Sequence, residues 1–399
     1  MTPFLAASLA ATVATLAAAV LLRGAAYAAF VGVLLAIHSA VLLGLQQVWE
    51  PLLPLAVWLQ LATLIHLLML IHARLRPTWY RAVVSIPAHF WMAGTFLAAP
   101  WAIAAALGLP PYGWWLPYLA ALIGVGQSLR SRPEVVDLVL DGEHHPELRR
   151  LHARRHRGGG PTTGTERPLR LVQITDPHLG PFMSEERLRG ICQRAVAEEP
   201  DLVLLTGDFF TMEGRGSSDS LARALAPLQA LSGRTFACLG NHDLEAPRAV
   251  AEGLAAAGIR LLVDDFTAVE TDAGPVQIIG LNHVWRKRAE RYAPVFARTP
   301  DPGDALRIVL LHDPSGFVHL PFGEADLVLS GHTHGGHVGL VSLGLDWTSI
   351  GGIIGMPDHG FWGRGPDRMY IHRANGHYGF PLRVGVPSEE SVLRIHLKS

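Results

Sequence analysis

The sequence predicts an α/β protein with a layered sheet, preceded by an all-α apolar region. The first observation behind this prediction is an uneven distribution of charge along the 399 residues. Residues 1–129 contain one acid, Glu50, and four arginines, whereas the rest of the chain holds 29 Lys/Arg and 33 Asp/Glu. The second observation is that short apolar runs alternate with helical patterns from residue 169 onward, as in layered α/β proteins.

The N-terminal region is typical of a series of membrane-spanning helices. Five apolar stretches each approach the ~20 residues that a helix needs to cross a bilayer, and aromatic side chains gather near their ends. Met1-Thr2-Pro3 carries no positive charge, which does not fit a cleaved signal peptide. We expect a transmembrane helical domain over residues 1–130 with about five spans, or four because the last stretch is short. The stretches are 4–22, 25–46, 52–73, 82–107 and 113–129.

The arginines predict on which side of the membrane the remaining chain lies. With five spans, Arg23, Arg74, Arg76, Arg81 and Arg130 all fall in loops on one side. The loops on the other side hold one acid and a neutral Leu-Pro-Pro turn. Because an excess of Lys and Arg marks the cytoplasmic side, we expect the N-terminus outside and the C-terminal part in the cytoplasm. A count of four spans would break this pattern.

Residues 131–168 are interpreted as a linker. They are rich in His and Arg and then contain a Gly-Gly-Gly-Pro run. The histidines could bind a metal, or the segment could be a solvated basic tract attracted to anionic lipid headgroups.

From residue 169 onward, apolar runs of strand length alternate with segments of helical periodicity. Helices of ~10–15 residues between strands indicate a layered α/β sheet. Cys192 and Cys238 are too few for a disulfide framework and are expected to be reduced core residues. The expected strands lie near 169–175, 201–206, 235–239, 260–263, 276–281, 306–311, 326–330 and 393–397, and the expected helices near 184–198, 218–231 and 246–258.

Polar blocks dominated by carboxylates and imidazoles directly follow five of these strands. Because ligands bind beyond the carboxyl ends of strands in such sheets, we expect the blocks to form one site. These donors suit Mn, Fe and Zn, so the sequence predicts a centre for two divalent ions. Any block alone could be a cap or a turn, and only their joint order carries the prediction. The blocks are Asp176-Pro177-His178, Gly207-Asp208, Gly240-Asn241-His242-Asp243, His312 and Gly331-His332-Thr333-His334.

The order of these blocks, D-x-H, G-D, G-N-H-D, H and G-H-x-H, resembles that of the calcineurin-like metallophosphoesterases. The glycine- and aromatic-rich tail and the closing PLRVGVPSEESVLRIHL resemble the bacterial membrane-associated phosphodiesterase branch. The likeness covers about residues 169–399 and implies a β-sandwich flanked by helices. The apolar N-terminal region looks like that of transmembrane members, which implies a multi-pass protein of the bacterial inner membrane.

The resemblance implies a role for each polar side chain of the blocks. The D-x-H spacing is expected to turn two ligands to the same face at a strand end, because side chains alternate with period two along a strand. Carried over position by position, Asp176, His178 and His334 would hold the first metal, Asn241, His312 and His332 the second, and Asp208 would bridge the two.

His242 then remains as a non-ligand imidazole and is the expected catalytic residue, able to protonate the leaving oxygen. Thr211 stands where many relatives have an aspartate that orients this histidine. The sequence leaves open whether Asp243 or Asp313 takes over that role.

We expect a membrane-anchored phosphohydrolase that cleaves a phosphodiester or pyrophosphate bond of a lipid-linked substrate by attack of a metal-bound hydroxide. Tethering raises the effective concentration of a lipid substrate, so the bilayer and a phosphorylated lipid are the expected partners. The alternatives are an anchored hydrolase of a soluble phosphoester and a non-catalytic membrane sensor with this fold. Nucleic acid is not an expected partner, because the chain after residue 129 has four more acids than bases.

Two further stretches are either contacts with the membrane surface or loops packed over the edge of the site. Residues 282–288 join an indole to three cations, and residues 347–370 combine isoleucines and aromatic residues with glycines. Both compositions fit an interfacial contact.

Overall fold

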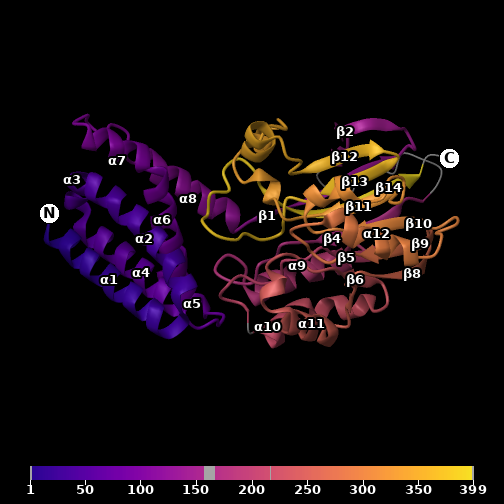
Figure 1. The fold of residues 1–399 in the computed structure, drawn as a ribbon, viewed down its shortest axis with the longest axis horizontal. Coiled ribbons are helices and arrows are strands. Elements are labelled where there is room, and N and C mark those ends of the chain that lie inside the picture. The colour runs from indigo at the N-terminus through magenta and orange to yellow at the C-terminus, as the bar shows by residue number, and fades with distance from the viewer. Residues whose placement is uncertain (1, 157–166, 216, 398–399) are drawn as a thin grey trace.

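The fold has two parts, a bundle of helices from the N-terminal third and a larger body of sheets and helices (Figure 1). The computed structural model describes residues 2–156, 167–215 and 217–397. The chain passes from the bundle into the sheets directly at the end of the last bundle helix, since the first strand begins at Ser131.

Three helical segments of the bundle are long and apolar enough to cross a membrane. Thr2 caps the first by accepting a hydrogen bond from the backbone N–H of Leu5. The segments are α1 (Pro3–Arg23), α2 (Ala25–Gly44) and Gln46–Met69, which combines α3 (Gln46–Trp49), η1 (Glu50–Leu52) and α4 (Leu53–Met69).

The fourth and fifth apolar stretches are also helical but do not form long straight spans. The fourth is bent by 49° before α7, where Pro100 has no N–H to donate to the preceding turn. The fifth, α8 (Leu116–Ser128), has 13 residues, fewer than the ~20 that a span needs. Five spans therefore stay a prediction. The bent segment consists of α5 (Thr78–Tyr80), η2 (Arg81–Ser85), α6 (Ile86–Leu97) and α7 (Ala99–Ala106).

Aromatic rings and one amide hold the interior of the bundle together. The buried indole of Trp91 packs edge-on against Trp49, with ring centroids 4.4 Å apart. Gln60 Oε1 accepts a hydrogen bond from Trp91 Nε1 at 3.0 Å and pairs with His38 Nε2 at 2.8 Å. These pairings satisfy polar groups that would otherwise be costly in an apolar interior.

Two seven-stranded mixed sheets form the C-terminal body. The first has the order β3-β1-β14-β4-β5-β6-β7 and the second the order β2-β12-β13-β11-β10-β9-β8. The strands of the first sheet are β1 (Ser131–Leu140), β3 (Arg154–His156), β4 (Leu169–Ile174), β5 (Leu202–Leu205), β6 (Thr235–Ala237), β7 (Arg260–Leu261) and β14 (Ser388–Leu397). Those of the second are β2 (His145–Leu151), β8 (Asp265–Thr271), β9 (Gly274–Gly280), β10 (Leu306–Leu310), β11 (Leu327–Ser330), β12 (Gly360–Gly365) and β13 (Asp367–Ile371).

The alternation of side chains along each strand explains why the sheets stack and are covered by helices. Leu202 and Leu204 of β5 belong to the core between the sheets, whereas Val203 and Leu205 face the helices outside. This four-layer sandwich confirms the predicted fold class, a β-sandwich flanked by helices and preceded by an all-α region. Helices α9 (Glu185–Ala197), α10 (Ser218–Leu225) and α11 (Pro247–Ala256) cover the first sheet, and α12 (Arg288–Arg298) covers the second.

The prediction of a linker over residues 131–168 was wrong for residues 131–156, which form β1, β2 and β3. Strand β1 lies inside the first sheet and pairs in parallel with β14, whose residues lie about 250 positions later in the chain. Arg155, part of the expected basic tract, forms ion pairs with Glu134 and Glu389 instead of being solvated. The physical reason is a long-range pairing that local composition cannot reveal. Residues 157–166 lie outside the described residues.

Every strand and helix expected after residue 168 is present within a few residues, but β8, β12, β13 and α12 were missed. The glycine- and aromatic-rich run 347–370 is therefore partly sheet, since β12 and most of β13 fall within it. Ile353 and Ile354, between Trp347 and these strands, remain largely exposed. The run thus combines a packed half with an exposed apolar loop.

The bundle packs against the edge of the sandwich at which β4, β5, β10 and β11 end. Arg81 Nε donates a hydrogen bond to the carbonyl of Pro181, 3.2 Å away in the loop after β4. Arg23 Nη1 lies 3.3 Å from Met212 Sδ in the loop after β5. Arginines at the ends of two helical segments, α1 and η2, thus lie on the side of the bundle that faces the sandwich.

The buried position of β1 generates a stability prediction. Leu138→Ala should cost about 2–5 kcal/mol of unfolding free energy, because Leu138 is fully buried between the sheets. Val139→Ala, a matched change at the next and 43% exposed position, should cost less than about 1 kcal/mol. Unfolding can be followed with a thiol-reactive dye during heating, since Cys192 and Cys238 are buried in this body. Equal, small effects of both changes would restore the linker interpretation.

Candidate metal centre

The first group of candidate ligands joins the loops after β4 and β11. Asp176 and His178 follow β4, and His334 follows β11. One ligand atom of each lies within 4.8 Å of the others. His334 Nε2 is 3.2 Å from His178 Nε2 and 3.4 Å from Asp176 Oδ1. The structure therefore brings together the three residues that the sequence assigned to the first metal.

The second group joins the loops after β5, β6, β10 and β11. Asp208, His312 and His332 offer ligand atoms within 4.8 Å of one another. His312 Nε2 lies at the centre, 3.2 Å from each of Asp208 Oδ2, His332 Nδ1 and Asn241 Oδ1. The structure thus also brings together the residues that the sequence assigned to the second metal.

The carboxylate of Asp208 lies between the two groups. Its Oδ2 atom is 3.2 Å from His312 Nε2 in the second group and 3.7 Å from His178 Nε2 in the first. Its Oδ1 atom accepts a hydrogen bond from the backbone N–H of His242 at 2.8 Å, which fixes the orientation of the carboxylate. This is the position that a bridging ligand needs.

Backbone conformations, and not the strand pleat, aim these side chains. The β4 strand ends at Ile174, so the period-two explanation for Asp176 and His178 was wrong. Both residues have positive φ angles, 49° and 47°, and Asp208 has a φ of 58°. Such left-handed conformations are uncommon for residues other than glycine and cost free energy, and they cluster at functional sites. His332 and His334 have positive φ angles as well, 69° and 52°, so the backbone is strained at five of the seven proposed ligands.

The donors and their charges fit divalent cations. Burial opposes the ionised form of Asp208, but the charged imidazole of His312, which also hydrogen-bonds to it, outweighs burial and holds the pKa of this carboxyl below its usual range. Burial also lowers the pKa of His178 to about 3, so this imidazole is neutral. Burial opposes protonation of His312, yet Asp208 outweighs it and raises the pKa of His312 to about 10. Ionised carboxylates and imidazoles that converge on one place attract positive charge, and these donors suit Mn, Fe or Zn.

His242 lies beside the two groups of candidate ligands, and the structure shows which residues surround its side chain. Thr211 donates its hydroxyl to the carbonyl of Leu179. Asp243 accepts backbone N–H groups of the loops after β5 and β6, and Asp313 is ion-paired with Arg288. Both candidates for orienting His242 are therefore engaged elsewhere.

Glu245 is the carboxylate that lies beside the His242 ring, a position for which the sequence left Asp243 and Asp313 open. Its Oε1 atom is 3.5 Å from His242 Nδ1, and its carboxylate also pairs with Arg215. Sequence reasoning missed this residue, although its position three residues after His242 was a usable signal. Tyr378 was also missed; its ring centroid is 4.4 Å from that of His242 and 5.0 Å from that of His178. Tyr378 comes from a distant loop, and no local pattern in the sequence indicates it.

Comparison with known proteins agrees with this geometry. The calcineurin-like phosphoesterase family matches residues 169–336. Phosphodiesterase YaeI of Escherichia coli is 28% identical over 187 residues, which cover 46% of this chain and 67% of YaeI. An uncharacterized metallophosphoesterase of Aquifex aeolicus is 30% identical over 237 residues, 58% of this chain and 86% of that protein. The UDP-2,3-diacylglucosamine pyrophosphatase LpxG of Chlamydia muridarum is 27% identical over 43% of this chain and 65% of its own length.

The chain therefore belongs to the calcineurin-like metallophosphoesterases, a family of metal-dependent phosphoric ester hydrolases, and the predicted family is confirmed. The chain spans 60% of the length of further relatives from Campylobacter jejuni and Helicobacter pylori.

The position of Asp208 generates a prediction about metal content. Protein stripped by a chelator and reloaded with manganese should hold about two ions per chain, and Asp208→Ala should lose both, because a bridging ligand serves both ions. Asp313→Asn is the matched control: it removes a carboxylate beside His312 that is engaged by Arg288, and it should keep both ions. Elemental analysis of the purified variants measures the outcome, and full occupancy in Asp208→Ala would contradict the assignment.

Proposed function

We propose that this protein is a membrane-anchored phosphohydrolase with two divalent metal ions, which cleaves a phosphodiester or pyrophosphate bond of a lipid-linked substrate. The observation that carries the proposal is the position of Asp208 between two buried groups of carboxylate and imidazole donors. When bound, two such ions lower the pKa of a water molecule and neutralise charge that develops on phosphoryl oxygens.

The ligand residues divide into two sets in this proposal. Asn241 contributes a neutral oxygen, which limits the negative charge of the set and so preserves the acidity of the ions. The first ion would be held by Asp176, His178 and His334, the second by Asn241, His312 and His332, and both by Asp208.

His242 is the residue that we propose to protonate the leaving oxygen. Its side chain is 23% exposed, so a substrate can reach it. Burial lowers the pKa of His242, and the carboxylate of Glu245 near Nδ1 favours the tautomer that carries a proton there. In the protonated ring, Nε2 holds the proton to be given to the leaving group. Glu245 is thus a positioning residue, and its ion pair with Arg215 holds it in place.

Three observations support a lipid-linked substrate and a membrane anchor. The bundle contains helices long and apolar enough to cross a membrane. It contacts the loops after β4 and β5, which carry ligands of the candidate centre. Among the relatives, LpxG is named for a pyrophosphatase activity on a diacylated sugar nucleotide, and YaeI is named a phosphodiesterase. A tether that places the site at the bilayer would raise the effective concentration of such a substrate.

We further propose that residues 1–130 form the membrane domain, that residues 131–399 form the catalytic domain, and that the latter lies in the cytoplasm. Arg23 and Arg81 support this orientation, because both contact the catalytic part and because arginines mark the cytoplasmic side of membrane proteins.

A hydrolase of soluble phosphoesters that is merely anchored is the main alternative. It would turn over soluble and lipid diesters with similar kcat/KM, whereas the proposed enzyme favours the lipid. A non-catalytic sensor is a weaker alternative, because all seven proposed ligand positions carry donors that suit a metal.

The role of His242 generates a kinetic prediction. His242→Ala should keep its metals but lose ~10²–10⁴-fold in kcat, the usual contribution of general acid catalysis. The loss should shrink for esters of nitrophenol, because such a leaving group needs little protonation. Stopped or continuous assays measure kcat on matched substrates that have good or poor leaving groups. An equal loss on both would assign His242 another role.

The position of Glu245 extends this test. Glu245→Ala should show the same dependence on the leaving group with a smaller loss, and Glu245→Gln should restore part of the rate, because its amide oxygen can still accept from Nδ1–H. Glu252→Ala, an exposed carboxylate on α11, is the control and should have no effect. A loss in Glu245→Ala that is independent of the leaving group would indicate a purely structural role.

The orientation can be tested with reporters fused after Ser399. A fluorescent protein that matures only in the cytoplasm should be bright there, and alkaline phosphatase at the same point should be inactive, because the arginine-bearing loops are expected inside. The opposite result would place the catalytic part, with the arginines that contact it, on the outer face and would contradict the proposed orientation.

A further inference from the structure

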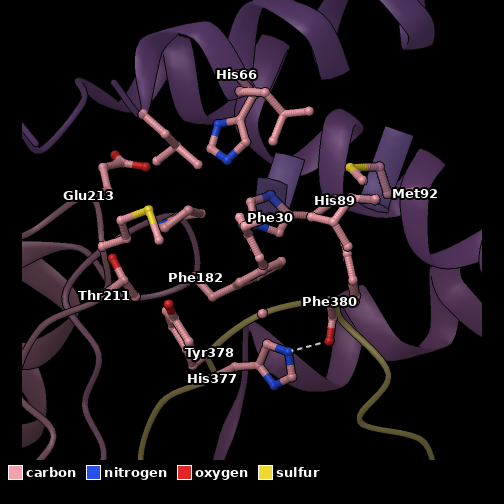
Figure 2. A pocket seen from close by; sticks show the side chains of 16 residues that line it. Phe30, His66, His89, Met92, Phe182, Thr211, Glu213, His377, Tyr378 and Phe380 are labelled. Atoms are coloured by element: carbon pink, nitrogen blue, oxygen red, sulfur yellow. Dashed lines mark hydrogen bonds between the residues drawn. The ribbon is translucent and has the colours of Figure 1, made fainter. Parts of the chain in front are cut away.

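An apolar cavity of about 260 Å³ lies between the helical bundle and the sandwich (Figure 2). Both parts of the chain build its walls. Leu34 of α2, Leu67 of α4 and Met92 of α6 line it from the bundle, and Phe182 and Phe380 line it from the loops of the catalytic part. The cavity therefore exists only where the two parts meet.

Tyr378 connects this cavity to the candidate metal centre. Its side chain lines the cavity, and its ring also contacts His242 and His178, with centroids 4.4 Å and 5.0 Å away. In Figure 2, Tyr378 and Thr211 point toward the cavity from the catalytic side. Thr211 contributes an uncharged hydroxyl, bonded to the carbonyl of Leu179, to this wall. One aromatic ring separates the cavity from the proposed general acid.

The other end of the cavity borders the outer surface of the bundle. Phe30 of α2 lines the cavity and is also 48% exposed. Its neighbour Val33, 60% exposed, lies on the surface that the membrane would cover in the proposed topology. An aliphatic chain could therefore pass from the bilayer along α2 into the cavity without crossing a polar layer.

The ionisable side chains in the wall are only partly satisfied within the protein, since Glu213 Oε2 and His377 Nδ1 have no hydrogen-bond partner among the described residues. Glu213 accepts a hydrogen bond from the backbone N–H of Arg76 at 3.1 Å, and burial raises its pKa to about 7. His89 Nδ1 pairs with the carbonyl of Ser85 at 2.7 Å. Apart from these polar atoms, most of the wall is aliphatic or aromatic. Apolar cavities smaller than this one bind apolar molecules rather than water.

We propose that this cavity receives one hydrocarbon chain of the substrate, while the phosphoryl group to which the chain is attached lies at the metal centre. The inference rests on the proposed function, because it assigns the chain of a lipid phosphoester to the same site. It makes the junction between bundle and sandwich a specificity site, and it explains why Tyr378 faces both the cavity and His242.

The inference has a measurable consequence for substrates that differ only in chain length. Each methylene that leaves water for an apolar site gains about 0.8 kcal/mol, which is about fourfold in kcat/KM. Ethyl, butyl and hexyl p-nitrophenyl phosphate share one leaving group and stay monomeric in water. With full-length, manganese-loaded protein in an amphipol, kcat/KM should rise along this series until the cavity is filled.

A matched pair of variants locates the effect. Leu34→Trp fills the cavity, so it should abolish the advantage of the hexyl ester over the ethyl ester. Val33→Trp adds the same indole to the outer surface of the same helix, and it should keep the advantage. A chain-length advantage that survives in Leu34→Trp would overturn the inference, as would equal rates for all three esters in the wild type.

Labelling with a light-activated probe gives a second measurement, in case Leu34→Trp also slows the ethyl ester. The probe is a p-nitrophenyl phosphate whose alkyl chain ends in a diazirine, applied to the wild-type protein and competed with the hexyl ester. Adducts on Leu34, Met92 or Phe380 that the hexyl ester prevents would support the inference, whereas adducts confined to outward residues such as Val33 would overturn it.

The experiment also separates this inference from the proposed function. Hydrolysis of all esters without any effect of chain length rejects the cavity as a chain site and leaves the phosphohydrolase standing. Failure to hydrolyse any ester, with two ions bound, rejects the phosphodiesterase form of the proposed function and the inference that rests on it. Labelling of the cavity without an effect of chain length on the rate would identify a structural lipid and would also overturn the inference.

Discussion

Two ionised carboxylates, those of Asp176 and Asp208, are buried at the edge where the two sheets of the sandwich meet, and the surrounding structure depends on their neutralisation. A buried charge without partners is very costly. The backbone N–H of His332 donates to Asp176, and that of His242 donates to Asp208. Imidazoles from loops of both sheets approach the same oxygens. The need to satisfy these charges explains why so many loops converge here in left-handed conformations.

The loops that present the ligands also build the junction with the helical bundle. The loop after β4 carries Asp176 at one end and Phe182, which packs against His89 of the bundle, at the other. The loop after β5 likewise continues from Asp208 to Met212, which contacts Arg23. A shift of the bundle would therefore act on the backbone that aims the ligands, since packed interiors transmit strain. The proposed anchor and the proposed site are therefore structurally coupled through these loops.

Much of the fold was predictable because its signals are local. The run LRLVQI and its counterparts have the length and composition of buried strands, and Ser184 before α9 caps that helix by accepting the N–H of Arg187. Strands β1, β2 and β3 escaped prediction because charged residues interrupt them and their partners lie far away in the sequence. Arg373, for example, pairs with Glu134 across more than two hundred residues. Composition alone therefore predicted a linker for this segment.

The sequence by itself determined the residues of the candidate centre, because ligand types at the ends of successive strands are a local pattern that the common edge of a sheet brings together. Only the tertiary structure decided how His242 is surrounded. Glu245 reaches it through a turn, and Tyr378 reaches it from a loop more than one hundred residues away. The cavity beside Tyr378 likewise has walls from α2, α4, α6 and the catalytic loops. The ligand residues could be predicted because their spacing along the chain is a local signal. The surroundings of His242 and the cavity could not, because they form only when distant segments, and the bundle and the sandwich, pack together.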